Sequence, residues 1–218
     1  MEHYGHGVLF ALKSDGTMWG MGENDKGQLG INDRTHRSSP VQVPGTTWKQ
    51  VDSNYVSFYA VKTDGTLWAW GRNYYGSLGI NNHANRSSPT QIPGTDWSSV
   101  RSQNYAALAL KTDGTLWSWG RSSWGSAAYN IGGSNNHRSS PVQVPGTTWG
   151  PFIACGATQN WHTRTDGTLW AWGVNSAGQL GLGGTTDRSS PVQIPGTDWN
   201  HCLTSYGSGG YAIQKVEP

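Results

Sequence analysis

Charged residues are scarce in this sequence: Asp, Glu, Lys and Arg make up 13% of its 218 residues. This share is about half of the roughly 25% found in an average soluble domain. A coiled coil or a protein of long helices needs Glu and Lys in quantity, so the composition excludes both. The formal net charge is only +2, which is too small to indicate binding to nucleic acid or to an acidic membrane surface. We therefore expect neither among the partners of this chain.

Long hydrophobic runs are also missing. No stretch approaches the roughly 20 apolar residues of a membrane-spanning helix. The short apolar run 8–12 is preceded by no Lys or Arg, whereas a secretory signal begins with basic residues. We expect no membrane insertion, and a location in the cytoplasm or within an assembled particle.

Cysteine is nearly absent, because the chain contains only Cys155 and Cys202. Two cysteines do not make the disulfide framework of a small secreted domain. They would pair only if neighbouring strands brought them close together, and we favour two buried thiols.

Glycine and aromatic residues are abundant instead, with 31 Gly, 13 Trp and 9 Tyr. So many large aromatic side chains argue against disorder, because they must be buried. Three sequence blocks also recur in register, at intervals of 49 to 53 residues. The blocks are Asp-Gly-Thr-x-Trp from Asp15, Asp64, Asp113 and Asp166, Arg-Ser-Ser-Pro from Arg37, Arg86, Arg138 and Arg188, and Pro-Gly-Thr from Pro44, Pro93, Pro145 and Pro195. The chain is therefore built from repeats of about 50 residues.

Each repeat reads as a set of short strands. An apolar run such as 58–61 precedes the Asp-Gly pair, and an alternating run such as 67–70 follows it. Gly supplies the positive φ that a tight hairpin needs, so Asp-Gly predicts the turn between these two strands. A third strand is expected around 40–43, and a fourth begins at Trp48 and its equivalents. Four strands per unit predict an all-β fold made of propeller blades, with no helix.

The residues after the hairpin carry a family resemblance. The pattern Trp68-x-Trp70-Gly71-x-Asn73-x-x-Gly76-x-Leu78-Gly79 resembles the repeat of the regulator of chromosome condensation family, as do the segments 172–181 and 22–30. The resemblance implies a β-propeller, usually of seven blades, that acts through protein contacts. This chain has only four Asp-Gly hairpins, which departs from the family pattern.

We expect one propeller domain over 1–218. Its repeats would span approximately 1–47, 48–96, 97–148 and 149–198, with a partial fifth repeat over 199–218. The segment 206–215 parallels 4–13, so both ends carry the strand that precedes an Asp-Gly turn. The sequence therefore predicts a closed or nearly closed ring of four to five blades. Alternatively, the last strand begins an unfinished blade or pairs with another subunit, because an open arc exposes strand edges and should oligomerise.

No catalytic or metal-binding pattern emerges. The repeated Asp occupies a hairpin turn, and four equivalent turn carboxylates cannot converge on one substrate. Glu23, Asp25 and Asp33 lack the alternating pattern of a calcium loop, and no pair of histidines has the spacing of a zinc site. We predict a non-catalytic protein that needs no cofactor or metal.

Function should therefore lie where the repeats differ. The loop after each Trp-Gly is irregular in the second and third repeats, and one further Trp stands outside the repeat template. The candidate binding residues are Tyr74, Tyr75, Trp124, Tyr129 and Trp161. Tyr and Trp dominate interface hot spots, although such residues also serve to pack an irregular loop against the next blade. Both interpretations stay open.

Two functions fit these observations. The first is a protein-binding or assembly module, such as a structural or adhesive subunit of a phage virion or surface appendage, which also self-associates through its terminal strands. The alternative is a lectin-like propeller that binds carbohydrate on exposed aromatic rings.

Overall fold

The computed structural model describes residues 7–54, 56–122, 137–204 and 210–214. It consists of antiparallel β-sheets and one short 3-10 turn, and no helix in these ranges is long and apolar enough to cross a membrane. The elements are β1 (Val8–Leu12), β2 (Met18–Gly22), β3 (Arg37–Gln42), β4 (Trp48–Ser53), β5 (Ser57–Lys62), β6 (Leu67–Gly71), η1 (Tyr74–Gly76), β7 (Arg86–Gln91), β8 (Trp97–Gln103), β9 (Ala106–Lys111), β10 (Leu116–Gly120), β11 (Arg138–Gln143), β12 (Trp149–Cys155), β13 (Gln159–Arg164), β14 (Leu169–Gly173), β15 (Arg188–Ile194), β16 (Trp199–Thr204) and β17 (Gly210–Gln214).

The strands form five sheets in chain order, and each sheet corresponds to a whole or partial blade. The second, third and fourth sheets have four strands each, namely β4–β7, β8–β11 and β12–β15, whereas the first has β1–β3 and the last has β16 and β17. Every pairing is between neighbours in sequence and is antiparallel, as in a β-meander. The predicted all-β propeller-blade fold is therefore confirmed.

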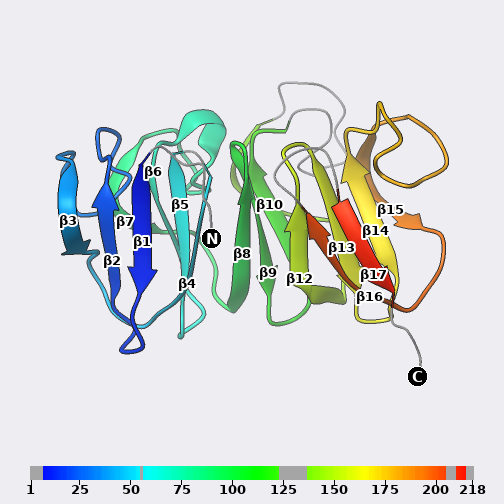
Figure 1. The fold of residues 1–218 in the computed structure, drawn as a ribbon, viewed down its shortest axis with the longest axis horizontal. Coiled ribbons are helices and arrows are strands. Elements are labelled where there is room, and N and C mark those ends of the chain that lie inside the picture. The colour runs from blue at the N-terminus through cyan, green and yellow to red at the C-terminus, as the bar shows by residue number, and fades with distance from the viewer. Residues whose placement is uncertain (1–6, 55, 123–136, 205–209, 215–218) are drawn as a thin grey trace.

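The sheets stand side by side in an arc (Figure 1). The inner strands β4, β8, β12 and β16 pack in that order, and β1 packs against β4. The first sheet lies on the left of this view, whereas the pair β16–β17 lies on the right together with the fourth sheet. The expected closure of the ring is not found among the described residues. The reason is that β16 pairs with β17 and does not supply the inner strand that the first sheet lacks.

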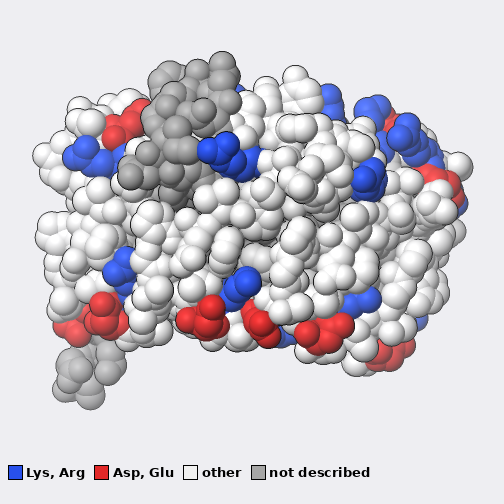
Figure 2. All heavy atoms as spheres, turned by 180° about the vertical axis from the view of Figure 1, so that it is seen from behind, with Lys and Arg blue, Asp and Glu red and all other residues white. Residues whose placement is uncertain are grey.

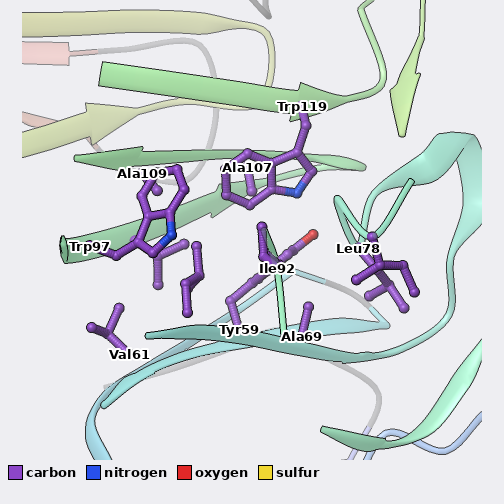
Figure 3. Close-up of a cluster of buried hydrophobic side chains, with 12 residues drawn as sticks. Tyr59, Val61, Ala69, Leu78, Ile92, Trp97, Ala107, Ala109 and Trp119 are labelled. Carbon is purple, nitrogen blue, oxygen red and sulfur yellow. The ribbon is translucent and has the colours of Figure 1, made fainter. Parts of the chain in front are cut away.

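Large aromatic side chains fill the spaces between blades. Figure 3 shows the core between the second and third sheets, where Tyr59 and Trp119 pack with their ring centroids 6.1 Å apart. The Trp119 indole also donates a hydrogen bond of 2.8 Å to the Ser77 carbonyl in the loop of the preceding blade. Trp70 donates in the same way to the Gln28 carbonyl at 2.7 Å. Each of these tryptophans therefore joins its own blade to the loop of the blade before it.

The hairpin turns confirm the interpretation of the repeated Asp-Gly pair. In the second blade, Asp64 Oδ1 accepts hydrogen bonds from the backbone N–H and the hydroxyl of Thr66, and these bonds lower the pKa of the Asp64 carboxyl. Gly65 has φ +79°, which supplies the left-handed turn. The Thr66 hydroxyl accepts a bond from the Trp68 indole at 2.8 Å. Asp15, Asp113 and Asp166 make the same two bonds, so these carboxylates are turn residues.

The hairpin turns place both acidic and basic side chains at one edge of the propeller. Figure 2 shows a row of acidic side chains along the lower edge, with Lys and Arg side chains just above it. The basic side chain that precedes each turn lies over tryptophan rings. Lys62 Nζ, for example, is 4.8 Å from the Trp48 ring centroid and 4.7 Å from that of Trp68. The repeated basic residues of this edge thus stabilise blade packing through cation–π contacts.

Candidate functional site

The loops that follow Trp-Gly stand at the opposite edge of the propeller from the hairpin turns. A buried asparagine organises each regular loop. Asn73 Oδ1 accepts the Leu78 N–H at 2.9 Å, while its Nδ2 donates to the carbonyls of Asn82 and Ala84. Asn24 and Asn175 make the equivalent bonds in the first and fourth repeats. The third repeat has Ser122 at this position, and a serine side chain is too short and has too few donors to make the same three bonds.

The loop of the second repeat departs from the template next to this asparagine. In the first and fourth repeats a glutamine side chain accepts a hydrogen bond from the backbone N–H of the residue two positions before it. Gln28 accepts this bond from Lys26, and Gln179 accepts it from Ala177. The second repeat has Ser77 there, and its hydroxyl bonds instead to Ser57 and to the Arg72 carbonyl. The chain turns through η1, in which Tyr75 takes φ +60° and ψ +19°. Left-handed backbone is unfavourable for a bulky residue, so contacts of the Tyr75 ring must hold it.

Those contacts come from the next blade. Tyr75 lies 5.6 Å from Tyr105 and 4.4 Å from His137, measured between ring centroids. Tyr74 lies 4.2 Å from Tyr75 and 5.9 Å from Tyr105. The tyrosine pairs meet edge to face, with interplanar angles of 62° to 73°. Among the residues that the structure describes, Tyr74 is one of three exposed large hydrophobic side chains, and 48% of it is exposed.

Two arginines complete the group. The Arg72 guanidinium lies 4.9 Å from the centroid of the Tyr74 ring. The Arg121 guanidinium lies 5.3 Å from that of Tyr75 and 6.0 Å from that of Tyr105. We call this group the tyrosine–arginine cluster. Its members are Arg72, Tyr74, Tyr75, Tyr105, Arg121 and His137.

His137 is held as a neutral side chain within the cluster. Its Nδ1 accepts the backbone N–H of Ser122 at 3.2 Å, which a proton on Nδ1 would prevent. Burial lowers the pKa of His137, and the charges of Arg121 and His83 lower it further. The cations of the cluster at neutral pH are therefore the two arginines.

The predicted site residues have three different outcomes. Tyr74 and Tyr75 lie together, as the sequence suggested. Trp124 and Tyr129 fall within 123–136, outside the residues that the structure describes. The assignment of Trp161 to a binding surface is wrong, because Trp161 is only 6% exposed and belongs to the core cluster against which Trp199 packs.

Sequence reasoning missed Tyr105 and His137. Tyr105 ends the turn between β8 and β9, where the equivalent residues of the other blades are Gly7, Val56 and Thr158. An aromatic residue at a position that otherwise varies among small and aliphatic residues was a detectable signal. His137 directly precedes the third Arg-Ser-Ser-Pro block and was interpreted only as a loop residue without the spacing of a zinc site.

The described residues hold no group of three or more His, Cys, Asp or Glu side chains arranged to bind a metal ion. The Cys155 thiol donates a long hydrogen bond of 3.6 Å to the Ser102 carbonyl. Cys155 is only partly buried, which departs from the expected buried thiol, and the side chain of Cys202 lies outside the described part of the chain, so the expectation for it stays a prediction.

Comparison with known proteins identifies the repeat. The sequence matches the model of the regulator of chromosome condensation (RCC1) repeat over residues 15–53, 64–102 and 166–211, and a second model of the same repeat over 48–77. No curated protein sequence gave a significant match.

Solved structures share the fold. Human WBSCR16 superposes with a TM-score of 0.78 at 22% sequence identity, over 97% of this chain and 56% of that one. Prp20p from Saccharomyces cerevisiae, described with its binding properties to Gsp1p and histones, gives a TM-score of 0.75 at 20% identity, over 98% and 55% of the two chains. Yeast RCC1 (Prp20) bound to Kap60 gives 0.77 at 20% identity, over 98% and 53%. The chain thus spans about half the length of these proteins.

Proposed function

Because the chain belongs to the RCC1 repeat family, we propose that it is a non-catalytic module that binds a protein partner at the tyrosine–arginine cluster. An RCC1-like propeller fits a protein-interaction module. Structures of the same fold are described as binding Gsp1p and histones, or as bound to Kap60. The partner of this chain is to be sought at its own irregular loops.

The observation that carries the proposal is the exposed Tyr74 ring supported by its neighbours. Tyr and Arg are the residue types enriched at interface hot spots. Tyr74 and Tyr75 extend from a loop whose base is held by the Asn73 hydrogen bonds, and Tyr75 keeps a left-handed backbone. A preorganised loop loses little conformational entropy on binding. Packing of the loop against the next blade explains the partly buried Tyr75, Tyr105 and His137. It does not explain why Tyr74 is exposed.

Selection of random displayed peptides on the purified chain tests the proposal. The matched variant is Tyr74→Ala with Tyr75→Gly, since glycine suits the left-handed backbone at position 75. We expect peptides whose affinity falls by about 30-fold on the double variant, which corresponds to a hot spot of about 2 kcal/mol. Its free energy of unfolding should fall by only about 1 kcal/mol, because Tyr74 is half exposed and the strain relieved by glycine offsets part of the lost Tyr75 ring contacts. Peptides that bind both proteins equally would contradict the assignment of the site.

Self-association through the terminal strands is a second part of the proposal. Leu9 of β1 is 56% exposed. Leu9 pairs with Met21, and the equivalent pair of the second sheet, Phe58 and Trp70, is buried against the first sheet. The apolar face of β1 therefore has the character of an interface between blades.

Light scattering during size-exclusion chromatography tests this part. We expect a solution mass above the 23.6 kDa of one chain, and a return to one chain in a Leu9→Lys variant, because a buried lysine opposes association. Threonine at the same position is the matched control and should preserve the assembly better. A wild-type mass of one chain at all concentrations would refute self-association.

Membership of a larger particle, such as a phage virion or a surface appendage, is the wider role that we propose for such an assembling module. A lectin-like propeller is the alternative, and a glycan array probed with the wild type and the Tyr74→Ala, Tyr75→Gly variant tests it. Binding of a glycan that the variant loses would favour that alternative.

A further inference from the structure

We propose that the first sheet of one copy is completed by β16 of a second copy, which takes the position of the inner strand beside β1. This inference rests on the self-association of the proposed function and names the two strands that carry it.

The open edge of β1 corresponds to an edge that is paired in the other blades. In the second, third and fourth sheets the innermost strand pairs with the strand that precedes the hairpin turn. In the first sheet that strand is β1, and among the described residues it pairs only with β2. Ala11 of β1 lies opposite Trp19, as Ala60 of β5 lies opposite Trp68. The open edge of β1 is therefore the equivalent of the edge of β5 along which β4 lies, and an open edge accepts a further strand.

The strand β16 is an inner strand in an incomplete sheet. It packs against β12 and β13 of the fourth sheet, as β8 packs against β4 and β5. Within the described ranges its own sheet has only one further strand, β17, and a sheet of two strands is marginally stable in water. Pairing with β1 of another copy places β16 in a sheet of four strands and keeps its contacts with β12. The strand β17 is released in the exchange.

The side chains between sheets indicate the same contact. Ile80 and Ile92 of the second repeat pack against the third sheet and are at most 8% exposed. Their equivalents in the fourth repeat, Leu182 and Ile194, are only partly buried. Leu9 is exposed on the face of the first sheet that corresponds to the face by which the second sheet packs against the first. The first sheet of a second copy would therefore cover the fourth sheet as the third sheet covers the second.

The two surfaces of one copy do not meet each other. In Figure 1 the first sheet lies on the left, whereas β16 lies on the right beside the fourth sheet. A contact between these different surfaces of two copies is heterologous, so it forms a ring or a filament. Met21 stands at the position of the interblade Trp70 in this contact, and its flexible side chain fills such a space without an indole hydrogen bond.

The repeat template gives the register of the exchanged strands. In the β4–β5 pair Val51 lies opposite Ala60. In the β16–β17 pair Cys202 occupies the position of Val51, opposite Ala212. Since Ala11 corresponds to Ala60, Cys202 of one copy should lie opposite Ala11 of the other. Residues directly opposite each other in antiparallel strands have Cα atoms about 4.5 to 5.5 Å apart, a separation that a disulfide spans.

Disulfide trapping between two chains with one cysteine each tests the inference. The first chain carries Ala11→Cys with both native cysteines replaced by serine, and the second carries Cys155→Ser and keeps Cys202. The two chains are refolded together from urea and oxidised, and the products are separated on a non-reducing gel and identified by mass. We expect a mixed disulfide dimer of the two chains.

The matched control replaces Ala11→Cys by Leu12→Cys in the first chain. Both residues are exposed, so neither substitution should disturb the fold, and a urea midpoint close to that of the wild type verifies this for each chain. Neighbouring residues of a strand point to opposite faces, so the yield of mixed dimer should be at least about fivefold lower with Leu12→Cys.

The possible failures are distinguishable. Equal yields from the two cysteine positions, or no mixed dimer, would overturn the strand exchange. A chain with Ala11→Cys and Cys202 that forms this disulfide only within itself would show that β16 reaches β1 of its own copy, which also overturns it. If light scattering shows an assembly but no mixed dimer forms, self-association stands and only the exchange fails. A solution mass of one chain at all concentrations would refute both.

Discussion

Replacement of Trp119 by alanine should lower the free energy of unfolding by about 4 kcal/mol, within the range observed when a buried Trp is truncated. Trp119 is fully buried between the second and third sheets. Its ring contacts Tyr59 and Trp97, with centroid separations of 6.1 Å and 6.3 Å. The substitution removes this packing and also leaves the Ser77 carbonyl without the indole hydrogen bond. Urea denaturation followed by circular dichroism measures the loss.

Two further variants separate the contributions. Trp119→Phe keeps most of the apolar ring and loses the indole N–H, so it should cost about 1 to 2 kcal/mol. Trp19→Ala is the control, because Trp19 lies half buried in the first sheet and should cost less than the loss of Trp119. An unchanged stability of Trp119→Ala, or an equal loss in both alanine variants, would contradict the role given to the interblade indole.

Acidification should destabilise the protein through His162. This side chain is fully buried in β13, against the Trp149 ring at 5.3 Å, and its Nδ1 lies 3.0 Å from the Thr163 carbonyl. Burial lowers the pKa of His162 to about 4. The unfolded chain, with an ordinary histidine pKa of about 6.5, then binds the proton more tightly than the folded one. Stability present above pH 6.5 is therefore lost as the pH falls from 6.5 to 4, by up to about 3 kcal/mol.

The variant His162→Ala isolates this contribution. The equivalent residues of the second and third blades are Ala60 and Ala109, so alanine fits the template of the sheet. The variant should lose stability at pH 7 because a cavity replaces the imidazole, but its unfolding free energy should change less between pH 6.5 and 4. The lowered pKa of His137 also makes the unfolding free energy fall on acidification. Because it does so equally in both proteins, its effect cancels in the comparison. Parallel pH profiles for the two proteins would refute the assignment to His162.

The fold could be predicted because its determinants are repeated. The Asp-Gly turn, the strand alternation and the interblade tryptophans occur in several copies, so one irregular copy does not obscure the pattern. Closure could not be predicted in the same way. The strand β17 and the strand β1 follow one template, and nothing in that template decides whether β16 pairs with one or the other.

The candidate site was predicted only in part, for a different reason. Tyr74 and Tyr75 stand out within a single loop, whereas Tyr105 and His137 reach them from other turns, and only the packing of two blades brings the four rings together. Trp161 was misassigned because it was judged by its absence from the repeated tryptophan positions and not by its register in β13. It pairs with Ala171 as Tyr59 pairs with Ala69, and that position faces the core in each blade.

The direction of the indole hydrogen bonds has a consequence for synthesis on the ribosome. Trp119 follows Ser77 by 42 residues in the chain, and Trp70 follows Gln28 by the same distance. At a translation rate of about 5 to 20 residues per second, a loop emerges roughly 2 to 8 s before the tryptophan that anchors it. The first and second blades thus wait for their successors before their loops take the final form. The nascent chain acquires its tyrosine–arginine cluster only after the third blade has left the exit tunnel.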